Sequence, residues 1–262
     1  MDFVLFSLLH QTTKTLKEIA KALGYYRGLF VESTGDTTVS IKADILFVEG
    51  IPLQNVDLTL DLNTTGANGR DGGDLASGDI WFIFVITDDI GSNIASYASK
   101  TTASPENLSL PSGYTKARLI SFCSLSSATS MWPFSQRDCD YFYGSPKPTL
   151  AENTTISTDV VSYSVYNFAP YEICNEVILD IHAEGTSDTT ADVITVQQTI
   201  SATGLIVERG KTDGFHEEGF ENDFVRLRIA VPISSQDYDI EFYSGTGNNT
   251  TTIYVAGAKL KI

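Results

Sequence analysis

The sequence predicts an all-β fold: two antiparallel β-sandwich domains of jelly-roll type, preceded by a short N-terminal amphipathic helix. Short runs rich in Val, Ile, Thr, Phe and Tyr follow Gly24 along most of the chain, and these residue types favour strands. Gly, Asn, Asp and Ser separate the runs at spacings of about 8 to 15 residues, which is typical of a sandwich. At 262 residues the chain is long enough for two domains with separate cores.

Residues 1–24 are predicted to form an attachment segment. Apolar residues recur at three- and four-residue intervals between residues 10 and 23, and Gly24 follows as a stop. A helix of about 15 residues is marginally stable alone in water, so its apolar stripe needs a partner, which is the chain's own sheet, a symmetry mate or a larger assembly. The residues expected at this attachment or oligomer interface are Phe3, Leu5, Phe6, Leu9, Leu16, Ile19 and Leu23.

Residues 25–145 are predicted to form the first sandwich domain. From residue 56 to residue 63, Val and Leu alternate with Asp, Thr and Asn, which gives one buried face and one wet face. Residues 80–86 (IWFIFVI) are apolar on both faces, so they should form a central strand covered on both sides. Strands are expected near residues 25–33, 38–48, 56–61, 80–87, 94–99 and 118–124.

A linker is expected at residues 146–153, in a stretch where two prolines alternate with polar residues. Residues 154–262 again contain strand-like runs separated by turn residues, and this pattern predicts a second sandwich domain. Its strands are expected near residues 160–167, 177–183, 193–201, 205–208, 225–231, 239–243 and 251–262.

The formal net charge of -16 argues against a nucleic-acid surface, because phosphate binding needs Lys and Arg to replace counterions. Scattered acids indicate instead a soluble surface that resists self-association. The apolar start at residues 3–9 is too short to span a bilayer, which takes about 20 residues, and it lacks the basic flank of a signal peptide. The chain is therefore expected to be made in the cytoplasm, without membrane insertion.

Metal-binding side chains are sparse. Cys123, Cys139 and Cys174 match neither a zinc site nor a redox pair, and we interpret them as reduced core residues, with a Cys123–Cys139 disulfide as the alternative. His216 precedes two adjacent glutamates rather than a ligand at helical spacing. The acidic residues 87–93 leave a structural calcium ion as a minor alternative, and no metal site is predicted.

The sequence contains no recognisable catalytic motif. GxSxG, P-loop and HExxH patterns are absent, and the glycine-rich residues 63–78 lead into a predicted strand rather than the helix that a phosphate site needs. The 33 acidic residues allow many carboxylate pairs, but their number says nothing about the separations that glycoside cleavage requires. The chain is predicted not to be an enzyme and to need no cofactor.

Aromatic residues supply the best candidates for binding. Trp132, Tyr141, Phe142 and Tyr143 lie in a loop-like stretch before the linker. Exposed rings there would stack on sugars or anchor a protein interface. The alternative, which we favour, is that the rings pack between the domains or at a subunit contact.

Two motifs of the first domain resemble bacteriophage fibre proteins. Residues 68–78 (NGRDGGDLASG) form a glycine-rich loop that leads into the aromatic strand around Trp81. Residues 110–116 (LPSGYTK) resemble the Leu-Pro-x-Gly-Tyr segment that precedes a basic strand in that family. Here Ala117 and Leu119 interrupt the basic strand, and the segment before the sheet is shorter than a typical fibre shaft, which favours a compact knob or a capsid decoration protein.

The resemblance implies a structural virion protein, often trimeric, which attaches through its N-terminus and projects its β domains outward. The expected partners are other virion proteins of the capsid or tail, further copies of the chain in a homotrimer, and a glycan or protein of the host surface. A fibre or knob that mediates host attachment is the favoured function. Capsid decoration, as a head fibre or cement protein, is the alternative, and a glycan-degrading tail enzyme is the third and weakest.

Overall fold

The computed structural model describes residues 26–156, 161–184, 194–200, 205–211, 223–230, 238–244 and 249–262. Within these ranges every regular element is a β-strand except one short 3-10 turn, η1 (Pro105–Asn107). The all-β prediction is confirmed, and the strand pairs described below are antiparallel apart from one. The predicted N-terminal helix and its interface residues, between residues 3 and 23, lie outside the described residues.

The chain folds into two compact units that interleave along the sequence. Of the described residues, unit 1 contains 26–73, 81–121 and 136–138, and unit 2 contains 74–80, 122–135 and those from 139 onward. The division therefore does not fall at residue 145. The expected linker at 146–153 is also wrong, because most of it belongs to strand β12 (Thr149–Ile156), and its two prolines come just before that strand, where proline is tolerated.

In unit 1, one long strand organises the first set of pairs. The strands β1 (Tyr26–Arg27), β2 (Phe30–Ser33) and β4 (Ile51–Asp61) all pair with β3 (Thr38–Val48). The turn between β3 and β4 has two residues, Glu49 and Gly50, with φ angles of 46° and 86°. Positive φ at both positions is what a tight hairpin turn requires, and the Glu49 carboxylate is held by Lys116 at 3.3 Å.

A second sheet carries the most buried strand of unit 1. The strands follow the order β5 (Gly69–Arg70), β7 (Ile94–Ser99), β6 (Ile80–Thr87) and β8 (Lys116–Ser127), with β5 and β7 parallel. All eight residues of β6 are buried. This confirms the prediction that the apolar run forms a central strand, because both of its faces are covered.

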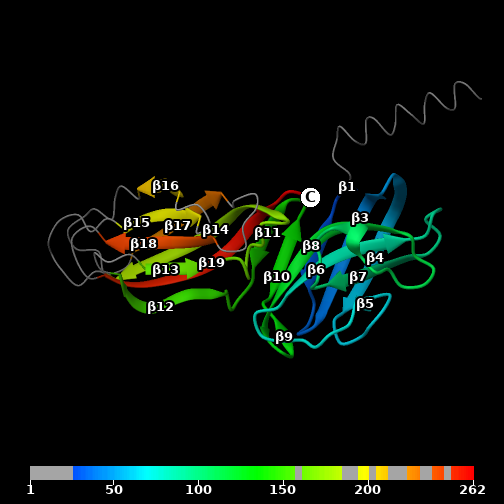
Figure 1. Cartoon of the computed structure of the whole chain (residues 1–262), viewed down its shortest axis with the longest axis horizontal. Coiled ribbons are helices and arrows are strands. Elements are labelled where there is room, and N and C mark those ends of the chain that lie inside the picture. The colour runs from blue at the N-terminus through cyan, green and yellow to red at the C-terminus, as the bar shows by residue number, and fades with distance from the viewer. Residues whose placement is uncertain are drawn as a thin grey trace, which may run out of the picture. The chain divides into compact units, whose positions relative to one another are not determined.

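Unit 2 contains two larger sets of strands, which are labelled in Figure 1. The first is part of a ten-stranded sheet and has the order β11 (Asp140–Tyr143), β19 (Asn249–Leu260), β14 (Cys174–Glu184) and β17 (Asp223–Ala230), and β12 also pairs with β19. The second has the order β13 (Val161–Ser164), β18 (Tyr238–Ser244), β15 (Ile194–Ile200) and β16 (Leu205–Lys211). The short strand β9 (Ser130–Met131) pairs with the end of β8, and β10 (Phe134–Arg137) contributes residues to both units.

One side of the first sheet of unit 2 forms its core. Val177, Leu179 and Ile181 on β14 are buried, as are Ile253 and Val255 on the neighbouring β19. The three cysteines are free thiols; Cys123 and Cys174 are buried, and Cys139 is half-buried. Burial raises the pKa of Cys123 to about 12, so this thiol stays protonated, as expected of a structural core residue.

Candidate functional site

The four aromatic residues singled out by the sequence have different environments. Tyr141 and Tyr143 are buried in strand β11 and not exposed in a loop, so the less favoured alternative of exposed rings does not hold for either. The Tyr141 ring is stacked between Phe122, with ring centroids 4.5 Å apart, and Phe134 at 4.9 Å. Because successive side chains of a strand point to opposite faces, only one of three consecutive rings reaches the surface here.

Phe142 is the ring that reaches the surface, with 41% of its area exposed. It is one of two large apolar side chains that are exposed among the described residues; the other is Ile90 in unit 1. Trp132 is half-buried in the connection between β9 and β10. The structure therefore separates the four predicted residues and leaves Phe142 as the candidate for contact with a ligand.

Phe142 belongs to one side of the first sheet of unit 2, which we call the outer face, on which Phe142 and Arg228 are exposed and Ile178 is buried. Directly opposite residues on antiparallel strands share a face, so the pairing register places its residues in rows. One row runs from Phe142 through Gly257 and Ile178 to Arg228. The row on one side contains Asp140, Lys259 and Glu176, and the row on the other contains Tyr254, Asp180 and Arg226.

Gly257 sits in the middle row because no side chain fits there. A Cβ atom at this position would lie 2.1 Å from the Tyr141 carbonyl oxygen, far inside van der Waals contact. Its neighbours on either side in the row are Phe142 and Ile178. The absence of a side chain at Gly257 therefore leaves one flank of the Phe142 ring without a cross-strand neighbour on β19.

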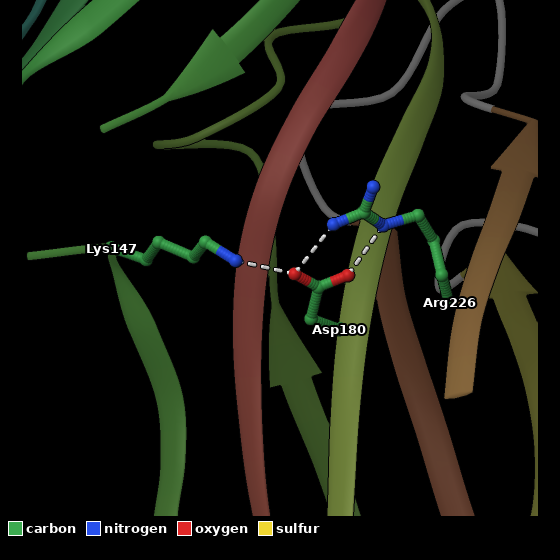
Figure 2. A network of polar contacts seen from close by, with 3 residues as sticks. All are labelled: Lys147, Asp180 and Arg226. Atoms are coloured by element: carbon green, nitrogen blue, oxygen red, sulfur yellow. Dashed lines mark hydrogen bonds and ion pairs between the residues drawn. The ribbon is translucent and has the colours of Figure 1, made fainter. Parts of the chain in front are cut away.

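A polar network of three residues lies at one end of the outer face (Figure 2). The Asp180 carboxylate is completely buried, and Arg226 donates two hydrogen bonds to it, from Nε at 2.7 Å and from Nη2 at 3.0 Å. Lys147, from the segment that precedes β12, donates from Nζ at 2.5 Å. Figure 2 shows the two cations approaching the carboxylate from opposite sides.

The contacts of this network shift the pKa values of Asp180 and Arg226. Burial raises the pKa of Asp180, but the hydrogen bonds and positive charges of Arg226 and Lys147 lower it by more, so the pKa lies below its usual value. The hydrogen bonds to Asp180 in turn raise the pKa of Arg226. Asp180 is therefore a fixed anion that holds two partly exposed cations in place.

The outer face is cationic in a strongly acidic chain. Among the described residues, the ion pairs of this face join four cations, Lys147, Arg226, Arg228 and Lys259, to three carboxylates, Asp140, Glu176 and Asp180. Each carboxylate lies within ion-pair distance of at least one of these cations. Since the whole chain has a net charge of -16, the surplus of positive charge on this face is a local property of the sheet.

A second polar site, in unit 1, lies where the sequence left a calcium ion as an alternative. The Asp88 carboxylate accepts hydrogen bonds from the backbone amides of Ile90, Ser92 and Asn93 and from the Ser92 and Asn93 side chains. The Ser92 hydroxyl contributes most to lowering the pKa of Asp88, to about 2. Because donors occupy both oxygens, this carboxylate is not arranged to bind calcium.

The same contacts present Ile90 to solvent. Its side chain is 81% exposed at the tip of the loop that Asp88 organises. A further hydrogen bond of 2.8 Å from the Thr115 hydroxyl to Asp89 ties the loop to the segment before β8. Unit 1 therefore exposes an apolar side chain, Ile90, on a loop that hydrogen bonds hold in place.

Within the described residues, no three His, Cys, Asp or Glu side chains gather in the geometry of a metal site. His182 lies half-buried on β14, and His10 and His216 fall outside the described ranges. No helix among the described residues is long and apolar enough to cross a membrane.

Sequence reasoning missed most of the outer face. Arg226 and Arg228 alternate with apolar residues in β17, and Asp180 interrupts an apolar run in β14. That alternation marks each strand as having one polar side, which is a usable signal. It does not show that the two strands are neighbours, so the cluster itself was not predictable. No family model matches the chain, and no curated protein matches it.

Proposed function

We propose that the chain is a structural protein of a tailed-bacteriophage particle, a trimeric fibre or knob that attaches through its N-terminal segment and contacts the host surface. The observation that carries this proposal is the outer face of unit 2, where exposed Phe142 and four cations stand on a sheet whose other side is a packed core. Side chains on such a rigid element are well suited to binding. The resemblance of residues 68–118 to fibre proteins supports the assignment to a virion.

The pairing of charges on the outer face favours binding over catalysis. Glycoside cleavage needs two carboxylates with different pKa values on either side of the scissile bond. Here Asp180 is held by two cations, Glu176 lies 3.9 Å from Arg228, and Asp140 lies 3.3 Å from Lys259. Carboxylates neutralised in this way are poor general acids.

We further propose that unit 2 is a β-sandwich of the jelly-roll type. Its support is the presence of two antiparallel sheets and the burial of one side of β14, through Val177, Leu179 and Ile181. An experimental structure of the full chain tests it: stacking of the second sheet on that side supports the sandwich, and any other arrangement contradicts it.

Capsid decoration is the second candidate, and the loop of Asp88 favours it. Exposed Ile90 on an anchored loop gives unit 1 a contact point of its own. A protein that bridges neighbouring capsid subunits needs contact surfaces on more than one part of its fold. Decoration would raise capsid stability without any binding to cells.

A count of copies in purified particles separates the two functions. We expect quantitative mass spectrometry, with the major capsid protein as the internal reference, to find a small multiple of three or six. Tens to hundreds of copies per particle would assign the protein to capsid decoration instead. Absence from particles would overturn the virion assignment.

The N-terminal attachment role has its own test. Deletion of residues 1–23 should prevent incorporation into particles, because the apolar residues of this segment are expected to supply the contact. Circular dichroism of the shortened protein should still show a β fold. Normal incorporation of the shortened chain would refute the role of this segment in attachment.

A further inference from the structure

We propose that the outer face of unit 2 binds an acidic polysaccharide, pairing its cations with sugar carboxylates and stacking Phe142 on a sugar ring. This inference rests on the proposed host-attachment function and names the class of ligand for the same face. It is carried by the arrangement of charges, by the geometry of the two arginines and by the exposure of Phe142.

The cations of the outer face lie in three successive rows, which suits a ligand with several charges. Lys259 lies in the row of Asp140, Arg228 in the row of Phe142, and Arg226 in the row of Asp180, where Lys147 joins it. Arg226 and Arg228 occupy alternate positions of β17, so their Cα atoms are about 7 Å apart. A polymer with a charge on successive sugars can therefore contact several cations at once.

The stacking of a sugar ring favours a polysaccharide over a phosphate polymer. Arginine binds carboxylates and phosphates alike through two parallel hydrogen bonds, so the cations by themselves select only for an anion. The ring of Phe142, which is 41% exposed, offers the apolar contact that a sugar uses and a phosphate chain does not.

Arg228 is the side chain best placed to receive a ligand carboxylate. Arg226 already directs Nε and Nη2 at Asp180. Arg228 is 59% exposed, and its Nη1 lies 3.9 Å from the nearest Glu176 oxygen, which is beyond hydrogen-bond distance. Its planar guanidinium matches a carboxylate through two parallel hydrogen bonds.

Phe142 lies in the same row as Arg228 and adds an apolar contact. The ring is 41% exposed, and Gly257 places no side chain next to it. The C–H face of a sugar can pack against such a ring while the hydroxyls stay in water. One exposed ring among charged groups suits an amphipathic, polar ligand.

A second copy of the chain fits this face less well. The fully buried centre of a protein interface is depleted of charged residues and rich in apolar ones. Here Asp180 lies buried within the face, and charged side chains surround it. These observations favour a saccharide over a protein, and the test below keeps the protein as a distinct outcome.

The test is a titration of the full-length protein with polygalacturonate oligomers at low salt, followed by isothermal calorimetry. Neutral dextran and inorganic polyphosphate serve as comparison ligands. We expect binding to polygalacturonate alone, and we expect added NaCl to weaken it because salt screens the exposed cations. Arg228→Gln should weaken binding about tenfold, and Phe142→Ser about fivefold.

Arg27→Gln is the matched control, since Arg27 is also an exposed strand arginine in an ion pair, with Asp44 at 3.3 Å, but belongs to β1 of unit 1. It should leave the affinity unchanged. Equal loss with Arg27→Gln, or equal binding of dextran or polyphosphate, would overturn the proposal. Self-association that Arg228→Gln abolishes, without saccharide binding, would also overturn it and assign the face to a second copy.

Failure of this inference can be told apart from failure of the proposed function. If the protein is found in particles and adsorbs to cells but does not bind polygalacturonate, the attachment function is supported and the acidic polysaccharide is refuted as its ligand. If the protein binds polygalacturonate through Arg228 and Phe142 but is absent from particles, the ligand class is supported and the virion role is refuted.

Discussion

Asp88 in unit 1 and Asp180 in unit 2 are both carboxylates with lowered pKa values, yet they reach that state by different routes. Asp88 is exposed, and all its hydrogen-bond donors lie within five residues of it in the sequence. Asp180 is completely buried, and its donors come from residues 33 and 46 positions away. Local turn chemistry accounts for the first, and the pairing of distant strands accounts for the second.

The difference predicts what each aspartate stabilises. Asp88 orders its own loop, because its partners are the amides of that loop. Asp180, on β14, joins that strand to β17 and to the segment before β12, because its two partners, Arg226 and Lys147, lie there. Disturbing Asp88 should therefore have local consequences, and disturbing the contacts of Asp180 should affect the whole unit.

The largest effect is expected from Arg226→Met. This change leaves the buried Asp180 carboxylate with Lys147 as its remaining cation, and leaving a buried charge poorly compensated costs about 3 kcal/mol. Urea unfolding measures the loss in the free energy of unfolding. Arg228→Met on the same strand is the control, with an expected change below about 0.5 kcal/mol because its ion pair with Glu176 is partly exposed and, at 3.9 Å, makes no hydrogen bond. Equal effects of the two variants would contradict the role assigned to Asp180.

Acid should produce the next largest effect. Both aspartates have folded pKa values below the usual 3.8, so each stabilises the fold above that pH, and the stabilisation is lost as the pH falls. For Asp88 the loss extends down to about pH 2. In Arg226→Met, burial then dominates at Asp180 and should raise its pKa, so acid unfolding followed by circular dichroism should begin at a higher pH than in the parent. An unchanged transition would show that Arg226 does not set this pKa.

The smallest effect is expected from Asp88→Ala. The amides of Ile90, Ser92 and Asn93 lose their acceptor, so they should exchange their hydrogens faster, while the midpoint of thermal unfolding should change less than in Arg226→Met. Hydrogen exchange followed by NMR measures the first of these results, and thermal unfolding followed by circular dichroism measures the second. Asp88→Asn, which keeps one acceptor oxygen, should lie between Asp88→Ala and the parent. A global loss of protection would show that the loop is not a local unit.

Several strands were predictable because their patterns are local. The apolar run of β6 and the boundaries of β7 match the expectation, since a strand covered on both faces needs apolar residues at every position. Strands β9, β10 and β11 were not predicted. They are short, two to four residues each, and their polar and aromatic residues are equally common in loops.

The aromatic residues illustrate the limit of sequence reasoning about a site. Tyr141, Phe142 and Tyr143 are chemically similar neighbours, and nothing in their order distinguishes them. Strand alternation sends Tyr141 and Tyr143 into the core and Phe142 to the surface. Whether the odd-numbered or the even-numbered residues of β11 face the core depends on the pairing of β11 with β19, a strand more than 100 residues away.

The sequence alone determined the all-β class, the central strand of unit 1 and the Asp88 turn, because hydrophobic period and turn chemistry act between residues close in the chain. Only the tertiary structure decided the interleaved units, the burial of Asp180 and the cationic outer face. These depend on which strands become neighbours and in what register. Contacts between residues far apart in the chain are set by the packing of the whole unit, and a local pattern does not contain them.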